Sequence, residues 1–204
     1  MSPNIIFVRV KDSYIYLKNI LKWAKENPEL KEAVDYPFEK LINDLDRTTD
    51  NFLTVFEKNK QFILKKIEDI SGFKWPPNMP VIYVYPIAFF NSFSHPLFLR
   101  VGGIKNSKFI TRKNGHILGT LIHELCHNNF INLSIDREMN ENLIHFIVIN
   151  ILNDIDSVYT KEYTDFHEKI GKKINIDILP EPIRTGRISI AYFYSKKRSS
   201  ETTP

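Results

Sequence analysis

The pattern of apolar and polar residues predicts three helices within the first seventy residues. The first begins near Ser13, whose hydroxyl can cap a helix, and ends before Pro28. Its apolar residues at helical spacing are Tyr14, Leu17, Ile20, Leu21 and Trp23. The second helix covers residues 28–46 and the third residues 50–70, each with one apolar side. We therefore expect residues 1–75 to form a helical N-terminal region, in which residues 4–10 are either a short strand or the start of a packed extension.

A break in the pattern separates these helices from a region that favours strands. Residues 71–80 contain Gly72, which can end a helix, and three prolines, which cannot continue one. Residues 81–86, 97–101 and 109–111 are rich in β-branched and aromatic residues, so they predict a small sheet. The aromatic loop over residues 87–95 can pack under that sheet or form the wall of a pocket.

Residues 115–130 predict a helix with an apolar side and a side that carries chemistry. The apolar stripe consists of Leu118, Leu121, Ile122 and Leu125, and the opposite stripe of His116, Thr120, His123 and His127. His123 and His127 are four residues apart, so both imidazoles can reach one metal ion. Glu124 borders the histidine stripe, where its carboxylate could hold a water molecule. Cys126 fits a small buried residue better than a metal ligand.

Residues 139–155 predict a second helix, which is apolar nearly all round and should therefore be buried. It nevertheless carries Glu141 and His145 one turn apart on the same face. Buried ionisable groups need partners, and a metal site would supply them. Glu138 is a rival to Glu141, although it belongs to the first turn, where the helix dipole already stabilises a carboxylate.

These two helices resemble the gluzincin branch of the zinc metallopeptidases. The resemblance rests on the sequence HELCH at residues 123–127 and on NENLIH at residues 140–145, and it covers roughly residues 80–155. The thirteen residues between His127 and Glu141 make the chain most similar to the compact minigluzincins. The resemblance implies a zinc ion held by His123, His127 and Glu141. It also implies that Glu124 is the catalytic base for peptide hydrolysis.

The chain departs from the gluzincin pattern at one position. His145 stands four residues after Glu141, where the family often has a carboxylate that orients the first histidine. A donor for the developing oxyanion is also needed, and six residues have a suitable side chain. They are Tyr159, Tyr163, His167, Arg184, Tyr192 and Tyr194. A substrate strand could add to an exposed sheet edge, which would place residues 97–103 in the peptide cleft.

The C-terminal part gives a mixed pattern. Residues 159–171 predict a helix whose Tyr163 and His167 either face the metal cleft or belong to an exposed polar face. Residues 175–182 predict an extended segment, and residues 187–194 alternate like a half-buried strand. Residues 196–204 have too few apolar side chains to fold alone, so we expect a disordered tail. The whole chain therefore predicts an α+β fold with a zincin-like domain over residues 76–195.

Composition narrows the class of protein. With 43% hydrophobic and 25% charged residues, the chain falls among ordinary soluble globular proteins. The net charge of +4 is too small to indicate nucleic-acid binding, and the single cysteine excludes an intramolecular disulfide. We find no secretion signal and no membrane span, so we expect a cytoplasmic protein that acts on a peptide or protein substrate. Two alternatives remain: a zinc-containing regulatory or interaction module without turnover, and a metal-free helical domain in which the motif is accidental.

Overall fold

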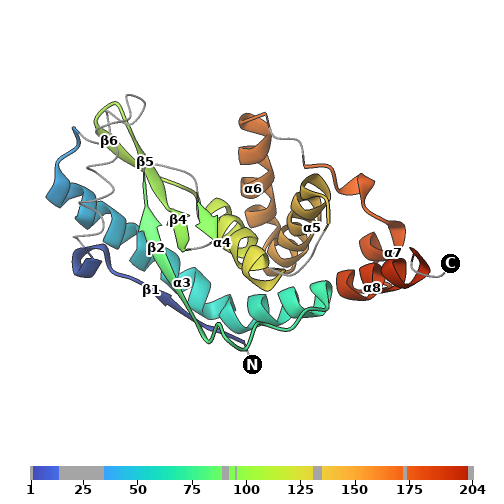
Figure 1. The fold of residues 1–204 in the computed structure, drawn as a ribbon. Helices are drawn as coiled ribbons and strands as arrows, with labels where there is room; N and C mark the ends of the chain where they lie inside the picture. Colours follow the sequence, from blue (N-terminus) through green and yellow to red (C-terminus); the bar gives the residue numbers. More distant parts are fainter. Residues whose placement is uncertain are drawn as a thin grey trace.

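The computed structural model describes residues 2–13, 35–88, 92–94, 96–130, 135–171 and 174–201, which have an α+β fold (Figure 1). The first helix that the sequence predicts, from about residue 13 to residue 27, lies almost entirely in residues 14–34, which are outside the described residues. None of the helices that the structure describes has the length and apolar character needed to cross a bilayer.

A four-stranded sheet joins the beginning of the chain to its middle. The strands are β1 (Asn4–Phe7), β2 (Val81–Ile87), β3 (Phe93–Ser94) and β4 (Leu97–Arg100), in the spatial order β1-β2-β4-β3. The first three in this order are parallel, with Asn4 opposite Val81, and β3 is antiparallel to β4. The strands predicted at residues 81–86 and 97–101 are therefore confirmed, and residues 4–7 form the strand that was one of two options. The 3-10 helix η1 (Val10–Ser13) follows β1.

A separate hairpin precedes the motif helix. It consists of β5 (Gly102–Lys105) and β6 (Lys108–Thr111), which pair in antiparallel fashion. The turn residues Asn106 and Ser107 have positive φ angles of 51° and 56°, which match the twist of a two-residue hairpin. The sequence predicts β6 but not β5, because the usual glycine is missing from the turn.

A single helix, α3 (Phe38–Ser71), replaces the second and third predicted helices. The second predicted helix, residues 28–46, is not continuous, because residues 35–37 are not helical, and its first residues, 28–34, lie outside the described residues. The predicted break at residues 47–49 is also wrong. Thr48 and Thr49 are buried there, and the Thr49 hydroxyl donates a hydrogen bond to the Leu45 carbonyl (2.8 Å). The two threonines therefore continue the buried side of the helix, although they are polar by residue type.

Helix α3 ends at Gly72, as predicted. Gly72 has a φ of 74°, and its N–H donates to the Glu68 carbonyl over 2.8 Å. This left-handed conformation favours glycine and satisfies one of the carbonyls left over at the end of a helix.

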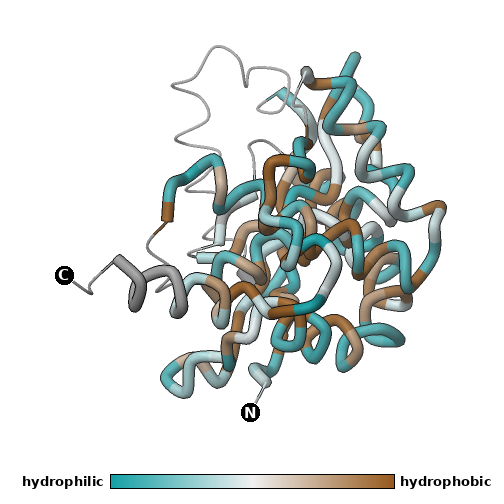
Figure 2. The backbone as a smooth tube through the Cα atoms, turned by 90° about the vertical axis from the view of Figure 1, so that its right-hand side faces the viewer, coloured by the Kyte–Doolittle hydropathy of each residue, from teal (hydrophilic) through white to brown (hydrophobic). Residues whose placement is uncertain are grey.

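Three further helices surround the middle of the fold. They are α4 (Asn114–Asn129), α5 (Arg137–Ile155) and α6 (Ser157–Lys169), and each confirms a predicted helix. Helix α4 contacts α3, α5 and α6 as well as strands β3 and β4, so it lies at the centre of the packing (Figure 1). Apolar segments gather in the middle of the molecule, where these helices meet (Figure 2).

The C-terminal segments differ from the prediction. The segment predicted as extended contains the 3-10 helix η3 (Ile176–Ile178) and the short helix α7 (Glu181–Arg184), and the predicted strand lies partly in α8 (Ile190–Glu201). Ile190 is buried and Phe193 and Tyr194 pack against the core, whereas Tyr192 is exposed. Phe193 and Tyr194 are three and four residues after Ile190, which is the spacing of one helix face. A short run of alternating apolar residues contains such pairs too, so the pattern fits a helix as well as a strand. Residues 196–201, predicted to be a disordered tail, continue α8.

Candidate metal centre

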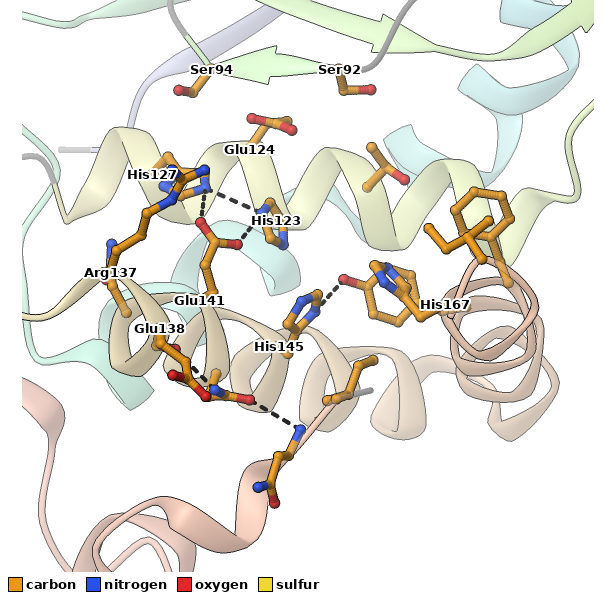
Figure 3. Close-up of a pocket in the computed structure, with 18 of the residues that line it drawn as sticks. Ser92, Ser94, His123, Glu124, His127, Arg137, Glu138, Glu141, His145 and His167 are labelled. Atoms are coloured by element: carbon orange, nitrogen blue, oxygen red, sulfur yellow. Dashed lines mark hydrogen bonds and ion pairs between the residues drawn. The ribbon is translucent and has the colours of Figure 1, made fainter. Parts of the chain in front are cut away.

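Helix α4 carries the two histidines of the HELCH motif on one side and packs its other side into the core. The four leucine and isoleucine residues of the predicted apolar stripe are fully buried. His123 and His127 are partly exposed and point into a cleft between α4 and α5 (Figure 3). Cys126 is completely buried, and burial raises the pKa of its thiol well above its usual value. The cysteine is therefore part of the packing, as expected from the sequence.

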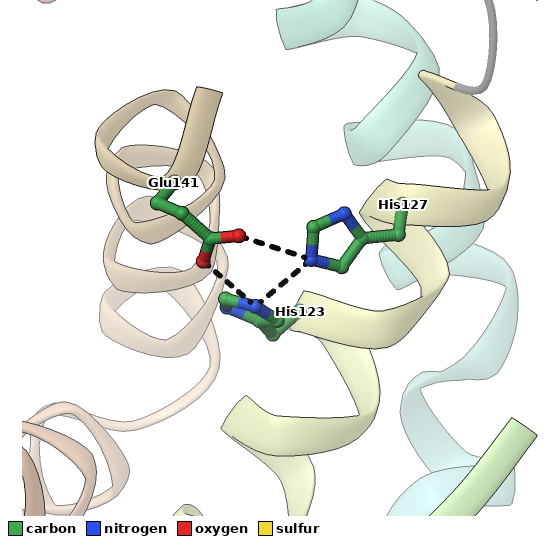
Figure 4. Close-up of side chains that lie close together, drawn as sticks. All are labelled: His123, His127 and Glu141. Carbon is green, nitrogen blue, oxygen red and sulfur yellow. Dashed lines mark hydrogen bonds and ion pairs between the residues drawn. The ribbon is translucent and has the colours of Figure 1, made fainter. Parts of the chain in front are cut away.

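Three side chains from the two helices meet at one point (Figure 4). Nε2 of His123 lies 3.2 Å from Nε2 of His127 and 3.4 Å from Oε2 of Glu141. Nε2 of His127 lies 3.6 Å from Oε1 of Glu141. Among the described residues these three form the group of ligand atoms that could hold a metal ion.

The distances within this group fit a tetrahedral metal site. Bonds of about 2.0–2.2 Å to a tetrahedral ion place neighbouring ligand atoms roughly 3.3–3.6 Å apart. The three measured separations, 3.2, 3.4 and 3.6 Å, lie at or close to this range. The donor set is also suitable, because imidazole nitrogen and carboxylate oxygen together bind zinc and several other divalent metals. His123, His127 and Glu141 can therefore hold a metal ion with little rearrangement.

Helix α5 brings Glu141 into the group and leaves Glu138 outside it. Asp136 caps the helix, because its carboxylate accepts hydrogen bonds from the backbone N–H groups of Glu138 (2.8 Å) and Met139 (3.1 Å). Glu138 is exposed in the first turn, where it lines the cleft without joining the metal-binding group. Glu141 lies one turn further along and faces both histidines (Figure 3).

The two carboxylates nearest the histidines have opposite pKa shifts. A hydrogen bond to His123, with the charges of the neighbouring histidines, lowers the pKa of Glu141 to about 2. Burial raises the pKa of Glu124 to about 7, and the negative charge of Glu141 adds to this effect. Glu124 is only 8% exposed, yet its carboxylate lines the cleft beside the metal-binding group. One carboxylate is thus suited to bind a cation and the other to exchange a proton near neutral pH.

A second layer of aromatic and histidine side chains supports the group. His145 lies beside His123, with their ring centroids 5.1 Å apart, and its Nδ1 is 2.8 Å from the Tyr163 hydroxyl. The ring of His167 packs against both His145 and Tyr163 (Figure 3). The gluzincin resemblance places a carboxylate where His145 stands, so in this chain a histidine and a tyrosine occupy that layer.

Tyr163 was not recognised from the sequence as a buried residue. An exposed polar face explained it equally well, but Tyr163 is only 1% exposed. Its ring packs so closely on Gly119 of α4 that a methyl group there would overlap it. Gly115 similarly approaches the backbone of Tyr159. The two glycines four residues apart were the available signal, because they allow α6 to lie directly against α4.

The cleft has a volume of about 1060 Å³ and is open to solvent. Of the six predicted oxyanion donors, Tyr163 and His167 line it, whereas Tyr159, Arg184, Tyr192 and Tyr194 are not among the described residues of its wall. Ser92 and Ser94 lie across the cleft from α5, on the far side of Glu124 (Figure 3). Strand β4 is paired on both sides, so β3 rather than residues 97–103 forms the edge of the sheet next to the site.

No family model matches the chain, and neither a curated protein nor a solved structure gives a significant match. The positions of His123, His127 and Glu141 are compatible with a metal site of the HExxH type.

Proposed function

We propose that this chain is a zinc-dependent peptidase in which Glu124 is the general base. One observation carries the proposal. Three ligand side chains meet at tetrahedral spacing in an open cleft, and the carboxylate of Glu124, which can take up a proton, lies beside them. The gluzincin resemblance of the two helices supports the same function.

Zinc is the metal we favour for this site. Two neutral imidazoles and one carboxylate leave a position open to water or substrate, which is the usual composition of a catalytic zinc site. Zinc bound there would act as a Lewis acid and lower the pKa of a water molecule towards neutrality. The same donors also suit iron(II), so metal analysis is part of the test.

Glu124 has the properties of a general base. Before a metal binds, burial raises its pKa to about 7, which suits a group that accepts a proton from water near neutral pH and releases it again. A carboxylate with an ordinary pKa is a weaker base and would accept the proton less readily. In the proposed reaction Glu124 accepts the proton of the attacking water and delivers it to the nitrogen of the leaving amine. Tyr163 and His167, which line the same cleft, are the remaining candidates to donate a hydrogen bond to the oxyanion.

The sheet edge next to the site suggests how a peptide binds. Among the described strands, β3 pairs only with β4, and Ser94 on β3 and Ser92 just before it line the cleft opposite α5. An extended peptide can add to such an edge through backbone hydrogen bonds and present its carbonyl groups to α4. This favours a peptide or an unfolded protein segment as the substrate.

The alternative is a zinc-containing regulatory or interaction module without turnover. Glu124 weighs against it, because a purely structural zinc site is closed by four protein ligands and has no use for a buried base. The two functions can be told apart by one measurement, because only the peptidase hydrolyses peptides in a way that depends on Glu124.

The test compares zinc-loaded wild type with Glu124→Gln on a mixed peptide library, with products detected by mass spectrometry. Glutamine keeps the shape of the side chain but cannot accept a proton, so cleavage should fall on the order of 100-fold to 10,000-fold. Zinc content and the unfolding temperature should stay close to those of the wild type. Glu138→Gln is the matched control, because Glu138 lines the same cleft outside the metal-binding group.

Equal cleavage by wild type and Glu124→Gln, both loaded with zinc, would exclude Glu124 as the base. If the zinc-loaded wild type cleaves no peptide of the library, the interaction module becomes the better function.

A further inference from the structure

A cationic site lies in the same cleft, away from the metal-binding group. Arg112, between β6 and α4, lines the cleft and is only partly exposed. Within the part of the chain that the structure describes, no carboxylate forms an ion pair with Arg112 or with nearby Arg100. The described interactions of the Arg112 side chain are with His116 and Phe166, which are both uncharged partners.

Two aromatic residues fix the position of the Arg112 guanidinium. Its Nη1 lies 3.1 Å from Nε2 of His116, and because arginine can only donate, the histidine nitrogen accepts. The guanidinium also lies over the ring of Phe166, 4.9 Å from its centroid, and Phe166 stacks on His116 with 3.6 Å between centroids. The backbone N–H of Arg112 donates to the Val101 carbonyl (3.0 Å), which ties the residue to the preceding hairpin. The guanidinium is thus held in place before any ligand arrives.

Among the described residues, no carboxylate offsets the positive charge at this site. Burial, together with the nearby charge of Arg112, lowers the pKa of His116 to about 3, so this histidine is neutral at pH 7. Burial and the charge of Arg100 lower the pKa of Arg112 to about 9, which still leaves it positive at pH 7. A partly buried cation without a counter-ion is unfavourable, so an arrangement that holds one in place is typical of a binding site for an anion.

The opposite end of the cleft is acidic. Four carboxylates line it, those of Glu124, Asp136, Glu138 and Glu141, together with one arginine, Arg137. Figure 3 shows Arg137 and Glu138 near the start of α5. A negatively charged group of a ligand is therefore attracted to Arg112. The difference between the two ends favours one orientation of a charged ligand in the cleft.

We propose that Arg112 binds a carboxylate of the peptide substrate. This inference rests on the proposed peptidase function and adds a specificity to it. The carboxylate is either the side chain of an aspartate or glutamate or the C-terminus of the peptide, because a guanidinium pairs with both in the same bidentate way.

The position of the site sets how far this carboxylate lies from the scissile bond. His116, which holds Arg112, is seven residues before His123 on α4, and seven residues span about 10 Å of helix. An extended peptide advances about 3.3 Å per residue. The carboxylate should therefore lie about three residues from the bond that is cleaved.

Peptide hydroxamates test this on zinc-loaded protein without requiring turnover. The probes are malonyl monohydroxamates of Ala-Glu amide and Ala-Gln amide, and of Ala-Ala with a free or an amidated C-terminus, with binding measured by calorimetry. Wild type should bind at least one carboxylate-bearing probe on the order of 10-fold to 100-fold more tightly than its neutral counterpart. The first pair reports on an acidic side chain and the second on the peptide C-terminus.

Arg112→Gln should abolish that preference and leave the affinity for the neutral probes close to that of the wild type. Arg112→Lys keeps the charge but loses the fork of donors, so it should retain only part of the preference. Arg137→Gln is the control, because it removes a positive charge from another position in the cleft wall. Equal affinity of wild type for charged and neutral probes, or a preference that survives Arg112→Gln, would overturn the proposal.

A second measurement needs neither zinc nor hydrolysis. The unfolding temperature is compared in sodium succinate and in sodium chloride of equal ionic strength, for wild type, Arg112→Gln and Arg137→Gln. Succinate should raise the unfolding temperature of wild type and Arg137→Gln more than that of Arg112→Gln, since an anion bound to the folded state stabilises it. An equal rise in all three proteins would contradict an anion site at Arg112. If no hydroxamate binds the zinc-loaded wild type, the peptidase function fails while this comparison still decides the anion site.

Discussion

The two ends of the cleft lie along one helix, yet they balance charge in opposite ways. At the metal end, His123 and His127 face Glu141, and Glu124 stands beside them. At the other end, Arg112 is held by neutral His116 and by Phe166. The first group directs ligand atoms of two histidines and a glutamate to one point, and the second places a guanidinium in the cleft wall. The two sets of side chains therefore suit ligands of opposite charge.

The largest effect is expected from removing a ligand at the metal end. Wild type should bind about one zinc per chain, and His123→Ala, His127→Ala or Glu141→Ala should each lose most of it, because a three-ligand site depends on every member. Metal analysis after dialysis measures this. Glu138→Ala is the control and should keep its zinc, since Glu138 lies outside the metal-binding group. Zinc content that is unchanged in the three ligand variants would mean that the ion is held elsewhere.

The next largest effect is expected from a substitution in the contact between α4 and α6, which positions residues at both ends of the cleft. In Gly119→Ala the added methyl group overlaps the Tyr163 ring, so the free energy of unfolding should fall by about 3 kcal/mol. Gly186→Ala is the comparison, because Gly186 has a φ of 68° but no neighbour that a methyl group would meet. It should lose only about 1 kcal/mol, from backbone strain. Urea unfolding of both variants gives the two values, and similar losses would argue against close packing at Gly119.

The hydroxyl of Tyr163 contributes a smaller amount. Tyr163→Phe removes the partner of the His145 Nδ1 atom and leaves that nitrogen buried, which should lower the free energy of unfolding by about 1–2 kcal/mol. Tyr159→Phe, one turn earlier on α6, is the matched control, because no hydrogen bond of the Tyr159 hydroxyl is found among the described residues. A loss of equal size in the control would show that the hydrogen bond to His145 is not the cause.

The smallest effect concerns pH at the arginine end. The folded-state pKa of His116, about 3, is lower than its ordinary value of 6.5. Its contribution to stability is thus fully present above pH 6.5 and is lost as the pH falls from 6.5 towards 3, because the unfolded chain takes up a proton that the folded chain excludes. Between pH 7 and pH 5.5 this group should lower the free energy of unfolding by about 1 kcal/mol. Urea unfolding at the two pH values should show a correspondingly smaller decrease for His116→Gln, and an unchanged decrease would assign the effect to other groups.

The metal end could be predicted from the sequence because its geometry is mostly local. Two histidines four residues apart share a helix face wherever that helix packs, and the burial of Leu118 and Leu121 fixes which face is outward. The placement of Glu141 needs a second helix, and there the likeness to a known family chose between Glu141 and Glu138. The structure brings Glu141 to the histidines, in agreement with that choice.

The arginine end and the second layer could not be predicted, because they depend on contacts between distant elements. Arg112 meets Phe166 only through the packing of α6 on α4, and Tyr163 is buried only because Gly119 lets α6 approach. The same limitation explains the errors in the fold. Thr48 and Thr49 are polar residues, yet the fold buries them. The alternating residues before Tyr194 fit a helix as well as a strand, and only their packing against the core distinguishes the two.

The pairing of β1 with β2 also constrains the order of folding. Asn4 lies opposite Val81, so the two strands meet only after a loop of more than seventy residues has closed. Closing so long a loop carries an entropic cost, and contacts between residues far apart in sequence slow folding. Helix α3 lies within this loop and can form from local contacts alone, which shortens the flexible part that remains. Strand β1 leaves the ribosome before β2, β3 and β4, yet it is expected to be the last of the four to join the sheet.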